Sequence, residues 1–339
     1  MRIARWVTAE GVHEDGFVVT DADGDLVVPF PDERRVANVL GDGLEAAHAL
    51  HDPAVRSLRA GQARGIRLAH VRLLPPVVPA TIRDFVAFEE HVEGVSASVD
   101  GVSEVVPEWY EAPTFYFTNP HTVRASGEVV PIPQTQRLDV ELEVAVVIGG
   151  VPGSSGVNLT PEAAASHIFG YTIMNDWSAR DLQSREMKVR LGPAKGKDFG
   201  TTLGPWIVTA DELVEFDDGG FLAVRAEWYL NGVLVGADLV SNMGWTFAEL
   251  VAYAARNSIV VPGDVLGSGT VGGGGCLGEL WGRAGALTPP PLEPGDEVRM
   301  VVEGIGEIVN VVGERVAGPG IPRARPRPRR RWRGVSAGA

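Results

Sequence analysis

The stretch Leu138-Asp-Val-Glu-Leu-Glu-Val-Ala-Val-Val-Ile148 decides how the centre of this chain folds. In its first half, apolar side chains alternate with Asp139, Glu141 and Glu143, which is the period of a strand with one buried face. The second half is apolar throughout, so the strand is predicted to enter a core. Glu141 and Glu143 share one face and repel each other. A divalent cation would turn this repulsion into attraction, and a solvated sheet face is the alternative.

The composition predicts a globular protein with a substantial core. The chain has 339 residues, of which 45% are hydrophobic, enough for two domains or one large one. No stretch approaches the ~18 uninterrupted apolar residues of a membrane span, and the first residues lack a signal-peptide core. A single cysteine, Cys276, excludes an internal disulfide. These features predict a cytoplasmic protein without a membrane partner.

Charge is unevenly distributed along the chain. The net charge is −14, although seven arginines gather between Arg323 and Arg333, so the rest of the chain is more acidic still. An acidic body disfavours a nucleic-acid partner, because phosphate binding needs a basic surface. The Arg/Pro-rich segment 318–339 is predicted to be a disordered tail.

Lysine is rare in this chain. Only three of the 30 basic residues are lysines, and they lie close together: Lys188, Lys195 and Lys197. Either the compact ammonium of a lysine is needed there, where arginine would not serve, or the cluster is chance.

Short strands and a few helices predict an α+β fold that is mainly β. Residues 1–75 are predicted to form a small β-rich N-terminal domain with a hairpin at Asp21–Asp25 and a helical stretch at 34–60. Pro75-Pro76 marks the boundary to a second domain, residues 76–317. Its strands are expected at 138–148, 168–174, 205–209, 223–230, 233–235, 258–266, 278–281 and 297–302. Its helices are expected at 84–92, 161–166, 178–190 and 245–256.

Polar side chains follow the buried strand expected at 168–174. The strand ends at Asn175-Asp176, where a carboxylate is a candidate third ligand for a metal. Ser178-Ala-Arg-Asp181 is a capping-box pattern that begins a helix. Arg180 and Gln183 share one face of that helix and are expected near the metal. The alternative for Arg180 is an ordinary surface charge.

Asp84 and His91 are seven residues apart, which in a helix is two turns on one face, about 10 Å. This spacing would let Asp84 reach a metal while His91 lies across the substrate as a base. A base needs an orienting carboxylate, and the sequence offers Glu93 nearby or Glu279 at a distance. His91 is one of seven histidines, and a histidine taken alone is more often ordinary than catalytic.

A glycine-rich segment at 267–275 weakly resembles a dinucleotide-binding pattern. Gly267-Ser-Gly-Thr-Val-Gly272 matches G-x-G-x-x-G, but more glycines and an expected strand follow it, whereas a dinucleotide site needs a helix. The glycines instead favour close approach of the backbone to a ligand, with Thr270 as a hydroxyl donor. Cys276 is either a nucleophile paired with His91 or, as is more common, a small buried hydrophobe.

Five motifs in this order resemble the fumarylacetoacetate hydrolase family across about residues 84–302. They are Leu138-Asp-Val-Glu-Leu-Glu143, Met174-Asn-Asp-Trp-Ser-Ala-Arg-Asp-Leu-Gln183, Gly196-Lys-Asp-Phe-Gly-Thr-Thr202, Gly267-Ser-Gly-Thr270 and Gly278-Glu-Leu-Trp281. The resemblance implies a mixed β-sandwich roll preceded by a small β-rich N-terminal domain, usually as a homodimer. It implies Mg²⁺, or Ca²⁺ or Mn²⁺, held by Asp84, Glu141, Glu143 and Asp176. It assigns Asp139 no ligand role.

The resemblance also implies a catalytic apparatus around the metal. His91 and Glu279 are implied to activate water. Lys197, Arg180 and Gln183 are implied to contact the substrate and its developing oxyanion. The implied reaction is hydrolysis of a C–C bond in a β-diketo acid, fumarylacetoacetate- or acylpyruvate-like, in the catabolism of an aromatic or related small acid.

The substrate end departs from the family pattern more than the metal end does. Tyr116 and Thr270 match substrate-binding positions, but Val86 stands where the hydrolase that names the family has tyrosine, and Gly272–Gly275 replaces a longer, more polar connection. One alternative is therefore a metal-dependent decarboxylase or isomerase of a 2-oxo or 2-hydroxydienedioate on the same site. A non-catalytic, metal-dependent binding protein is another, and a NAD-linked enzyme rests on the glycine pattern alone.

Overall fold

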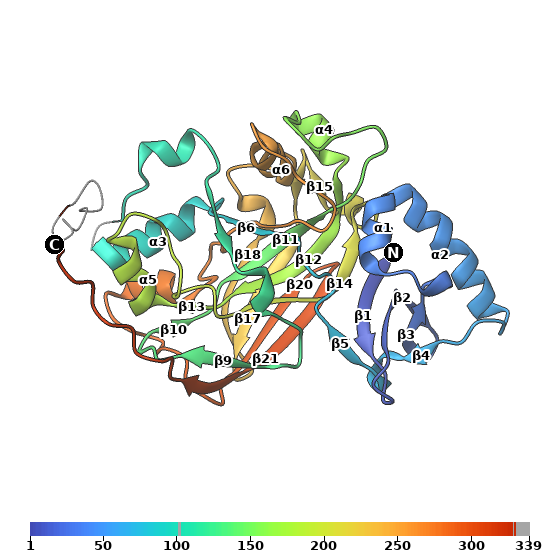
Figure 1. Ribbon diagram of the computed structural model, residues 1–339, viewed down its shortest axis with the longest axis horizontal. Helices are drawn as coiled ribbons and strands as arrows, with labels where there is room; N and C mark the ends of the chain where they lie inside the picture. Colours follow the sequence, from blue (N-terminus) through green and yellow to red (C-terminus); the bar gives the residue numbers. More distant parts are fainter. Residues whose placement is uncertain (101–102, 328, 330–339) are drawn as a thin grey trace, which may run out of the picture.

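The structure is a computed structural model of the chain, and it describes residues 1–100, 103–327 and 329. Its centre is one large mixed sheet (Figure 1). In order across that sheet, the strands are β4 (Ile66–Arg67), β3 (Gly24–Pro29), β2 (His13–Asp21), β1 (Arg2–Val7), β14 (Thr201–Thr209), β12 (Ile168–Asp176), β11 (Leu142–Ile148), β19 (Val265–Gly267), β6 (Ile82–Phe85) and β7 (Phe115–Thr118). At its side, β5 (Arg72–Leu74) pairs with β1 and β8 (Val123–Arg124) pairs with β14.

A second sheet of five strands packs against the first. Its order is β18 (Val233–Leu239), β17 (Arg225–Leu230), β20 (Glu297–Val302), β21 (Gly306–Val316) and β9 (Val129–Pro133). Two short ribbons complete the strands: β10 (Leu138–Asp139) with β13 (Ser178–Ala179), and β15 (Asp217–Asp218) with β16 (Phe221–Leu222). The helices are α1 (Val36–Asp42), α2 (Leu44–Arg59), α3 (Glu89–Asp100), α4 (Pro161–Ala165), α5 (Arg180–Met187), α6 (Phe247–Ala255) and α7 (Leu277–Ala284).

Strand β11 explains why the large sheet is covered on both faces. All of its side chains are buried. Val144 and Val146 belong to a core cluster that includes Trp228 and Met300 of the five-stranded sheet. The neighbours on the opposite face, such as Ala145, join a second cluster with side chains of α1. Because alternate side chains of a strand point to opposite faces, one apolar run supplies both cores and makes a sandwich.

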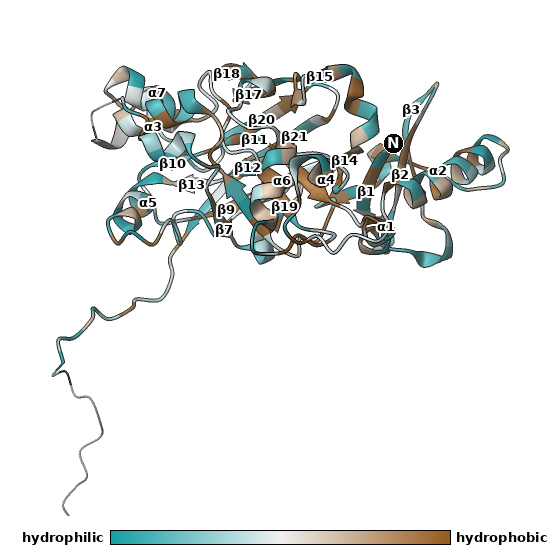
Figure 2. Cartoon of the chain, turned by 90° about the horizontal axis from the view of Figure 1, so that it is seen from above, coloured by the Kyte–Doolittle hydropathy of each residue, from teal (hydrophilic) through white to brown (hydrophobic). Residues whose placement is uncertain are grey.

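The first 75 residues, blue in Figure 1, form one end of the molecule, and α3 and α5 lie at the opposite end. The hairpin predicted at Asp21–Asp25 is confirmed as the turn between β2 and β3. Strand β1 pairs with β14, with Ile3 opposite Ile207, so the N-terminal strands continue the large sheet. In Figure 2, α2 carries both hydrophobic and hydrophilic parts, as expected of a helix that packs by one side. The division into domains at residue 75 stays a prediction.

Most expected elements are confirmed within a few residues, among them the strands at 168–174, 205–209, 223–230 and 297–302. The stretch 138–148 is two strands, β10 and β11, separated by Val140 and Glu141. Residues 258–266 are mostly not strand, since β19 begins only at Val265. The predicted tail is described only in part, because residue 328 and residues 330–339 lie outside the described residues. No helix in the described part is long and apolar enough to cross a membrane.

The helix expected at 84–92 is wrong in its first half. Asp84 lies in β6, opposite Gly267 of β19 on one side and Tyr116 of β7 on the other. Helix α3 begins only at Glu89 and carries His91. Residues Ile82–Phe85 are buried and paired on both sides, so partners distant in sequence decide their conformation and the helical spacing does not apply.

The strand expected at 278–281 is also wrong, because these residues lie in α7. Its first turn finds acceptors for backbone N–H groups that a helix leaves unpaired. Asp139 accepts hydrogen bonds from the N–H groups of Leu277 (2.7 Å) and Gly278 (2.8 Å). The Sγ of Cys276 accepts one from the N–H of Glu279 at 3.3 Å. Asp139 is distant from α7 in the sequence and reaches its first turn only in the folded chain, so the local sequence does not predict this cap.

Candidate metal and substrate site

Three of the four predicted metal ligands lie together. Asp84 in β6, Glu141 just before β11 and Asp176 at the end of β12 each place one carboxylate oxygen within 4.8 Å of the others. All three side chains are buried. Sheet pairing holds them there, since β11 runs beside β12 and β19 links β11 to β6.

Glu143 lies beside Asp84 but outside that closest group. Both carboxylates border Gly267, where an added Cβ would be 2.7 Å from Asp84 Oδ1 and 2.7 Å from Glu143 Oε2. Glycine therefore leaves the space in which the two acids approach each other. Glu143 is fully buried, and it is brought to the cluster by the strand that the alternating sequence predicted.

Several carboxylate oxygens in this cluster find no hydrogen-bond donor among the described residues. These are Asp84 Oδ1, Asp176 Oδ1 and both oxygens of Glu143. Burial, followed by the nearby charge of Asp176, raises the pKa of Asp84 well above its usual range. Burial and the charge of Asp84 do the same to the pKa of Glu143. Unsatisfied, crowded carboxylates of this kind suit a hard divalent cation, so the residues present fit the implied metal.

Lys197 is the one buried lysine among the three in the chain's lysine cluster. Its Nζ donates to Glu141 and, at 2.8 Å, to Asp176 Oδ2. Burial opposes its charge, but Asp176 and Glu141 outweigh burial and raise the pKa of Lys197. The loop just before Lys197 is held by the carboxylate of Glu186. This carboxylate accepts hydrogen bonds from the backbone N–H groups of residues 194–196 at 2.9, 2.9 and 3.1 Å.

Arg180 is not the surface charge of the alternative interpretation. Its Nη1 lies 2.8 Å from Glu141 Oε1, and its Nε donates to Asp139 Oδ2 at 2.8 Å. It also donates to Gln183 Oε1 at 3.1 Å, as expected for neighbours on one helix face. Burial alone would raise the pKa of Glu141, but Lys197 and Arg180 outweigh it and hold that pKa below its usual range.

Asp139 has a structural role that the sequence analysis missed. It is fully buried, pairs with Arg180 and caps the first turn of α7. An added Cβ on Gly278 would lie 3.2 Å from Asp139 Oδ2, so that contact is close. Its place in the same alternating run as Glu141 was a usable signal, but a ligand role was the only one considered for it.

His91 faces the carboxylate cluster from α3. Its Nε2 lies 4.0 Å from Glu141 Oε1, and its Nδ1 lies 3.7 Å from Cys276 Sγ. Burial lowers the pKa of His91 to about 4, against the opposing charge of Glu141, so the ring is neutral near pH 7. A neutral ring can accept a proton.

Glu279 lies in the neighbouring helix without a hydrogen bond to His91. Its Oε1 accepts the N–H of Gly274 at 2.9 Å and pairs with Arg283. Gly94 of α3 packs directly on the Glu279 side chain, where an added Cβ would be 2.4 Å from Cγ. Burial raises the pKa of Glu279 to about 7. The two predicted members of the dyad therefore lie on packed helices but do not touch in this structure.

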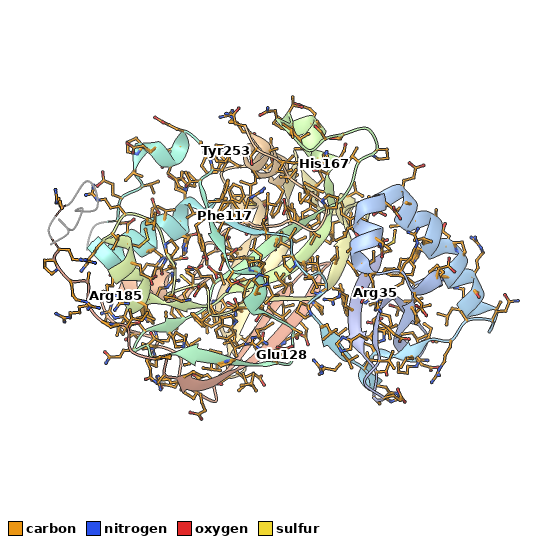
Figure 3. The ribbon with its side chains drawn as sticks, in the orientation of Figure 1. Arg35, Phe117, Glu128, His167, Arg185 and Tyr253 are labelled. Carbon is orange, nitrogen blue, oxygen red and sulfur yellow. The ribbon has the colours of Figure 1, made fainter. Side chains whose placement is uncertain are left out.

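One cavity of about 350 Å³ gathers most of the predicted site residues. It is bordered by Asp84, His91, Tyr116, Glu141, Arg180, Gln183, Lys197 and Thr270. Tyr116 donates a hydrogen bond to Asp176 Oδ2. Glu143, Asp176 and Glu279 are fully buried and do not line the cavity. Helix α5 contributes Arg180, Gln183 and Met187 to this cavity. In Figure 3, Arg185 of the same helix lies at the opposite end of the molecule from Arg35.

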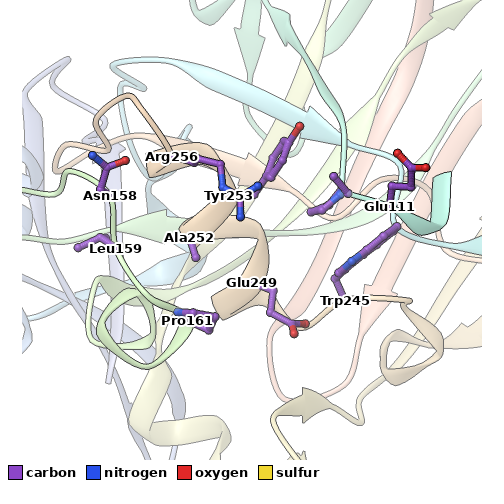
Figure 4. Close-up of a pocket in the computed structure, with 11 residues that line it drawn as sticks. Glu111, Asn158, Leu159, Pro161, Trp245, Glu249, Ala252, Tyr253 and Arg256 are labelled. Carbon is purple, nitrogen blue, oxygen red and sulfur yellow. The ribbon is translucent and has the colours of Figure 1, made fainter. Parts of the chain in front are cut away.

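A second pocket, of about 300 Å³, lies along α6 (Figure 4). Trp245, Tyr253 and Arg256 border it, and none of the predicted site residues does. Its acids, Glu111 and Glu249, belong to no group of three or more possible metal ligands among the described residues. The chemistry predicted from the sequence therefore gathers in the other cavity.

Comparison with known proteins identifies the family. The profile described as Fumarylacetoacetate (FAA) hydrolase C-terminal matches residues 80–313. The fumarylacetoacetase of Arabidopsis thaliana is 31% identical over 284 residues, which are 68% of this chain and 67% of that protein. The oxaloacetate tautomerase YisK of Bacillus subtilis (strain 168) is 32% identical over 206 residues, 60% of this chain and 62% of that protein.

The predicted fold class is confirmed by comparison with a solved structure. The fold of this chain is similar to that of maleylpyruvate hydrolase from Sphingobium sp. SYK-6 in complex with manganese (II) ion and pyruvate, with a TM-score of 0.65. The match covers 93% of this chain and 100% of that one at 19% identity, which shows the fold alone. The matched profile spans the carboxylate cluster, Arg180, Lys197 and α7. This chain belongs to the fumarylacetoacetate hydrolase family.

Proposed function

We propose that this chain is a divalent-metal-dependent hydrolase that cleaves a C–C bond in a β-diketo acid, fumarylacetoacetate- or acylpyruvate-like. The observation that carries the proposal is the meeting of Asp84, Glu141 and Asp176 within 4.8 Å, beside a cavity lined by Asp84, Glu141, Arg180 and Lys197. Few arrangements other than a cation site explain buried carboxylates without donors.

Asp84, Glu141, Glu143 and Asp176 are the residues that would hold the ion, with Mg²⁺ as the first choice and Ca²⁺ or Mn²⁺ as alternatives. When bound, the ion supplies Lewis acidity to the oxygens of a 1,3-dicarbonyl. Tyr116 orients Asp176 through their hydrogen bond. Lys197 and Arg180 hold Glu141 from two sides, which fixes the carboxylate before any substrate arrives.

His91 is the proposed base. Its neutral ring accepts a proton from water at Nε2 as the water oxygen bonds to the substrate carbonyl carbon. The negative charge that develops on the carbonyl oxygen is stabilised by the ammonium of Lys197, the guanidinium of Arg180 and the amide of Gln183, each donor worth a few kcal/mol in such sites. The C–C bond then breaks, its electron pair stays on the departing carbon as an enolate, and the proton on His91 returns to that carbon.

A second candidate function is a tautomerase, isomerase or decarboxylase on the same site, where no water attacks. Two observations favour it: one relative is an oxaloacetate tautomerase, and His91 makes no hydrogen bond to Glu279. Replacing His91 separates the two reactions. The hydrolase predicts that His91→Gln abolishes hydrolysis, whereas the alternative predicts that tautomerisation or decarboxylation continues.

A panel of acylpyruvates, fumarylacetoacetate and oxaloacetate, assayed with Mg²⁺ or Mn²⁺ and again with EDTA, tests the proposal. Hydrolysis of a diketo acid that EDTA stops and Mg²⁺ restores is expected. Full turnover by metal-free protein would contradict it, as would tight binding of the acids without any turnover. The homodimer and the cytoplasmic location stay predictions.

A further inference from the structure

The site cavity has an apolar end that the proposed chemistry does not use. It is formed by residues of the turn after β6, of α3, and of α5 with the loop that follows: Val86, Val92, Val95, Met187 and Pro193. Among the described residues that line the cavity, the further polar side chains there are the hydroxyls of Ser96 and Thr114. A ligand held by Arg180 and Lys197 at one end must therefore place its other end against apolar surface.

No lysine or arginine among the described residues lines this end to pair with a second carboxylate. Among the described residues, Arg180 and Lys197 are the only lysine or arginine side chains that line the cavity. Both already pair with buried acids, Arg180 with Asp139 and Glu141, and Lys197 with Glu141 and Asp176. A carboxylate at the apolar end would lose its hydration without gaining a partner, which is costly.

The loop after α5 adds apolar surface beside the same end. Met187 is 49% exposed, Val189 75% and Leu191 91%. Glu186 fastens the base of this loop by its three hydrogen bonds to backbone N–H groups. Apolar side chains left in water next to a cavity gain free energy when an apolar group covers them. Lys188 and Arg190 belong to the loop but do not line the cavity.

We propose that the substrate is a mono-acid: a β-diketo acid whose acyl group ends in an apolar chain or ring, with Met187 and Val95 as the residues that determine this specificity. The inference rests on the proposed function and narrows it, because fumarylacetoacetate-like diacids carry a second carboxylate where this cavity is apolar. Each methylene buried against the apolar wall should raise kcat/KM about fourfold.

The test compares acylpyruvates of increasing acyl length with a diacid of matched length. We expect kcat/KM to rise about fourfold for each of the first few added methylenes, and the terminal carboxylate to lower kcat/KM at least about tenfold. A preference for the diacid, or no dependence on acyl length, would overturn the inference while leaving the proposed hydrolase standing.

Met187→Lys puts a cation at the apolar end and should shift the ratio of diacid to mono-acid kcat/KM at least about tenfold toward the diacid. Met187→Leu should keep the apolar preference. Val233→Lys, on β18 and 67% exposed in the parent, adds the same charge away from the cavity and should not shift the ratio. Equal shifts in Met187→Lys and Val233→Lys would contradict the assignment of Met187.

A binding measurement separates this inference from the proposed function. Calorimetry with Mg²⁺ present compares 2-oxohexanoate with 2-oxoadipate, which has the same length but a terminal carboxylate. Tighter binding of 2-oxohexanoate, by about tenfold, supports the apolar end even if no diketo acid is hydrolysed. Tighter binding of 2-oxoadipate overturns it whatever the turnover.

Discussion

The two ends of the site cavity are built in different ways. The carboxylate end stands on strands of the large sheet, and Asp84, Glu143 and Asp176 are at most 3% exposed there. The apolar end stands on α3, α5 and the loop after it, where Met187 is 49% exposed. Strand pairing fixes the carboxylates from several directions, whereas the loop is fixed mainly at its base by Glu186. The proposed metal ligands therefore stand on paired strands, and the residues proposed to select the substrate stand on helices and a loop.

The largest effect is expected from Glu141, because its carboxylate meets Lys197, Arg180 and His91 at once. Glu141→Gln should lower kcat/KM by about 10³-fold or more and abolish binding of the divalent ion, since loss of even an outer partner of a metal ligand costs about 10–100-fold. Calorimetric titration with Mn²⁺ and steady-state kinetics measure both. Glu307→Gln, which loses an exposed pair with Arg299, is the matched control. Unaltered ion binding in Glu141→Gln would contradict the assignment of Glu141 as a metal ligand.

Asp139 should matter next, although it touches neither ion nor substrate. Asp139→Asn weakens the hold on Arg180 and on the first turn of α7, so we expect about a 10–100-fold loss of kcat/KM. Leaving the Arg180 charge without this partner should also lower the free energy of unfolding by about 3 kcal/mol. Urea unfolding and kinetics check the two effects separately. Normal kinetics in a destabilised Asp139→Asn would make the residue purely structural.

Gly267 gives an intermediate effect at the carboxylate end. An added methyl group in Gly267→Ala would press on Asp84 and Glu143 at 2.7 Å, so we expect weaker ion binding and a loss of about 1–3 kcal/mol of stability. Gly41→Ala is the control, because a Cβ there meets nothing within 4 Å. Ion titration and thermal unfolding of both variants measure these effects. Equal ion affinity and equal stability of Gly267→Ala and Gly41→Ala would contradict the close approach of Asp84 and Glu143 to Gly267.

The smallest effect is a pH dependence at Glu279, which lies in α7 against Gly94 of α3. The folded protein raises the pKa of Glu279 to about 7, above the ordinary value of 4.5, mainly by burial. The contribution of this proton to stability is complete below about pH 4.5 and is lost as the pH rises through about 7. Relative to Glu279→Gln, the parent should lose on the order of 1–3 kcal/mol of unfolding free energy between pH 5 and 8. Urea titrations at several pH values test this. If the unfolding free energies of the parent and of Glu279→Gln changed with pH in parallel, the charge of Arg283 would cancel the effect of burial on the pKa of Glu279.

Local patterns predicted the carboxylate end better than its surroundings. Glu141 and Glu143 follow from a period of two, and Asp176 from the end of an apolar strand. Asp84 was placed in a helix because the pairing of β6 with β19 and β7 joins residues far apart in sequence. The helix α7 was missed because its caps, Asp139 and Cys276, act through the folded structure.

The apolar end of the cavity was harder to predict from the sequence than the carboxylate end. Glu186 fastens its loop by accepting backbone N–H groups, and no sequence pattern marks such an acceptor. Val86 was noted as a departure from the family, but its neighbours Val95 and Met187 reach the same cavity only through the packing of α3 and α5. Side chains that meet across three elements leave no periodic signal in any one of them.

Calorimetric titration of EDTA-treated protein with Mn²⁺, with hydrolysis of an acylpyruvate followed in the same samples, tests the proposed metal-dependent hydrolysis. We expect one ion bound per chain, turnover that rises in proportion to bound ion, and loss of both in Glu141→Gln. Full turnover before any ion is added, or tight ion binding that survives in Glu141→Gln, would contradict it.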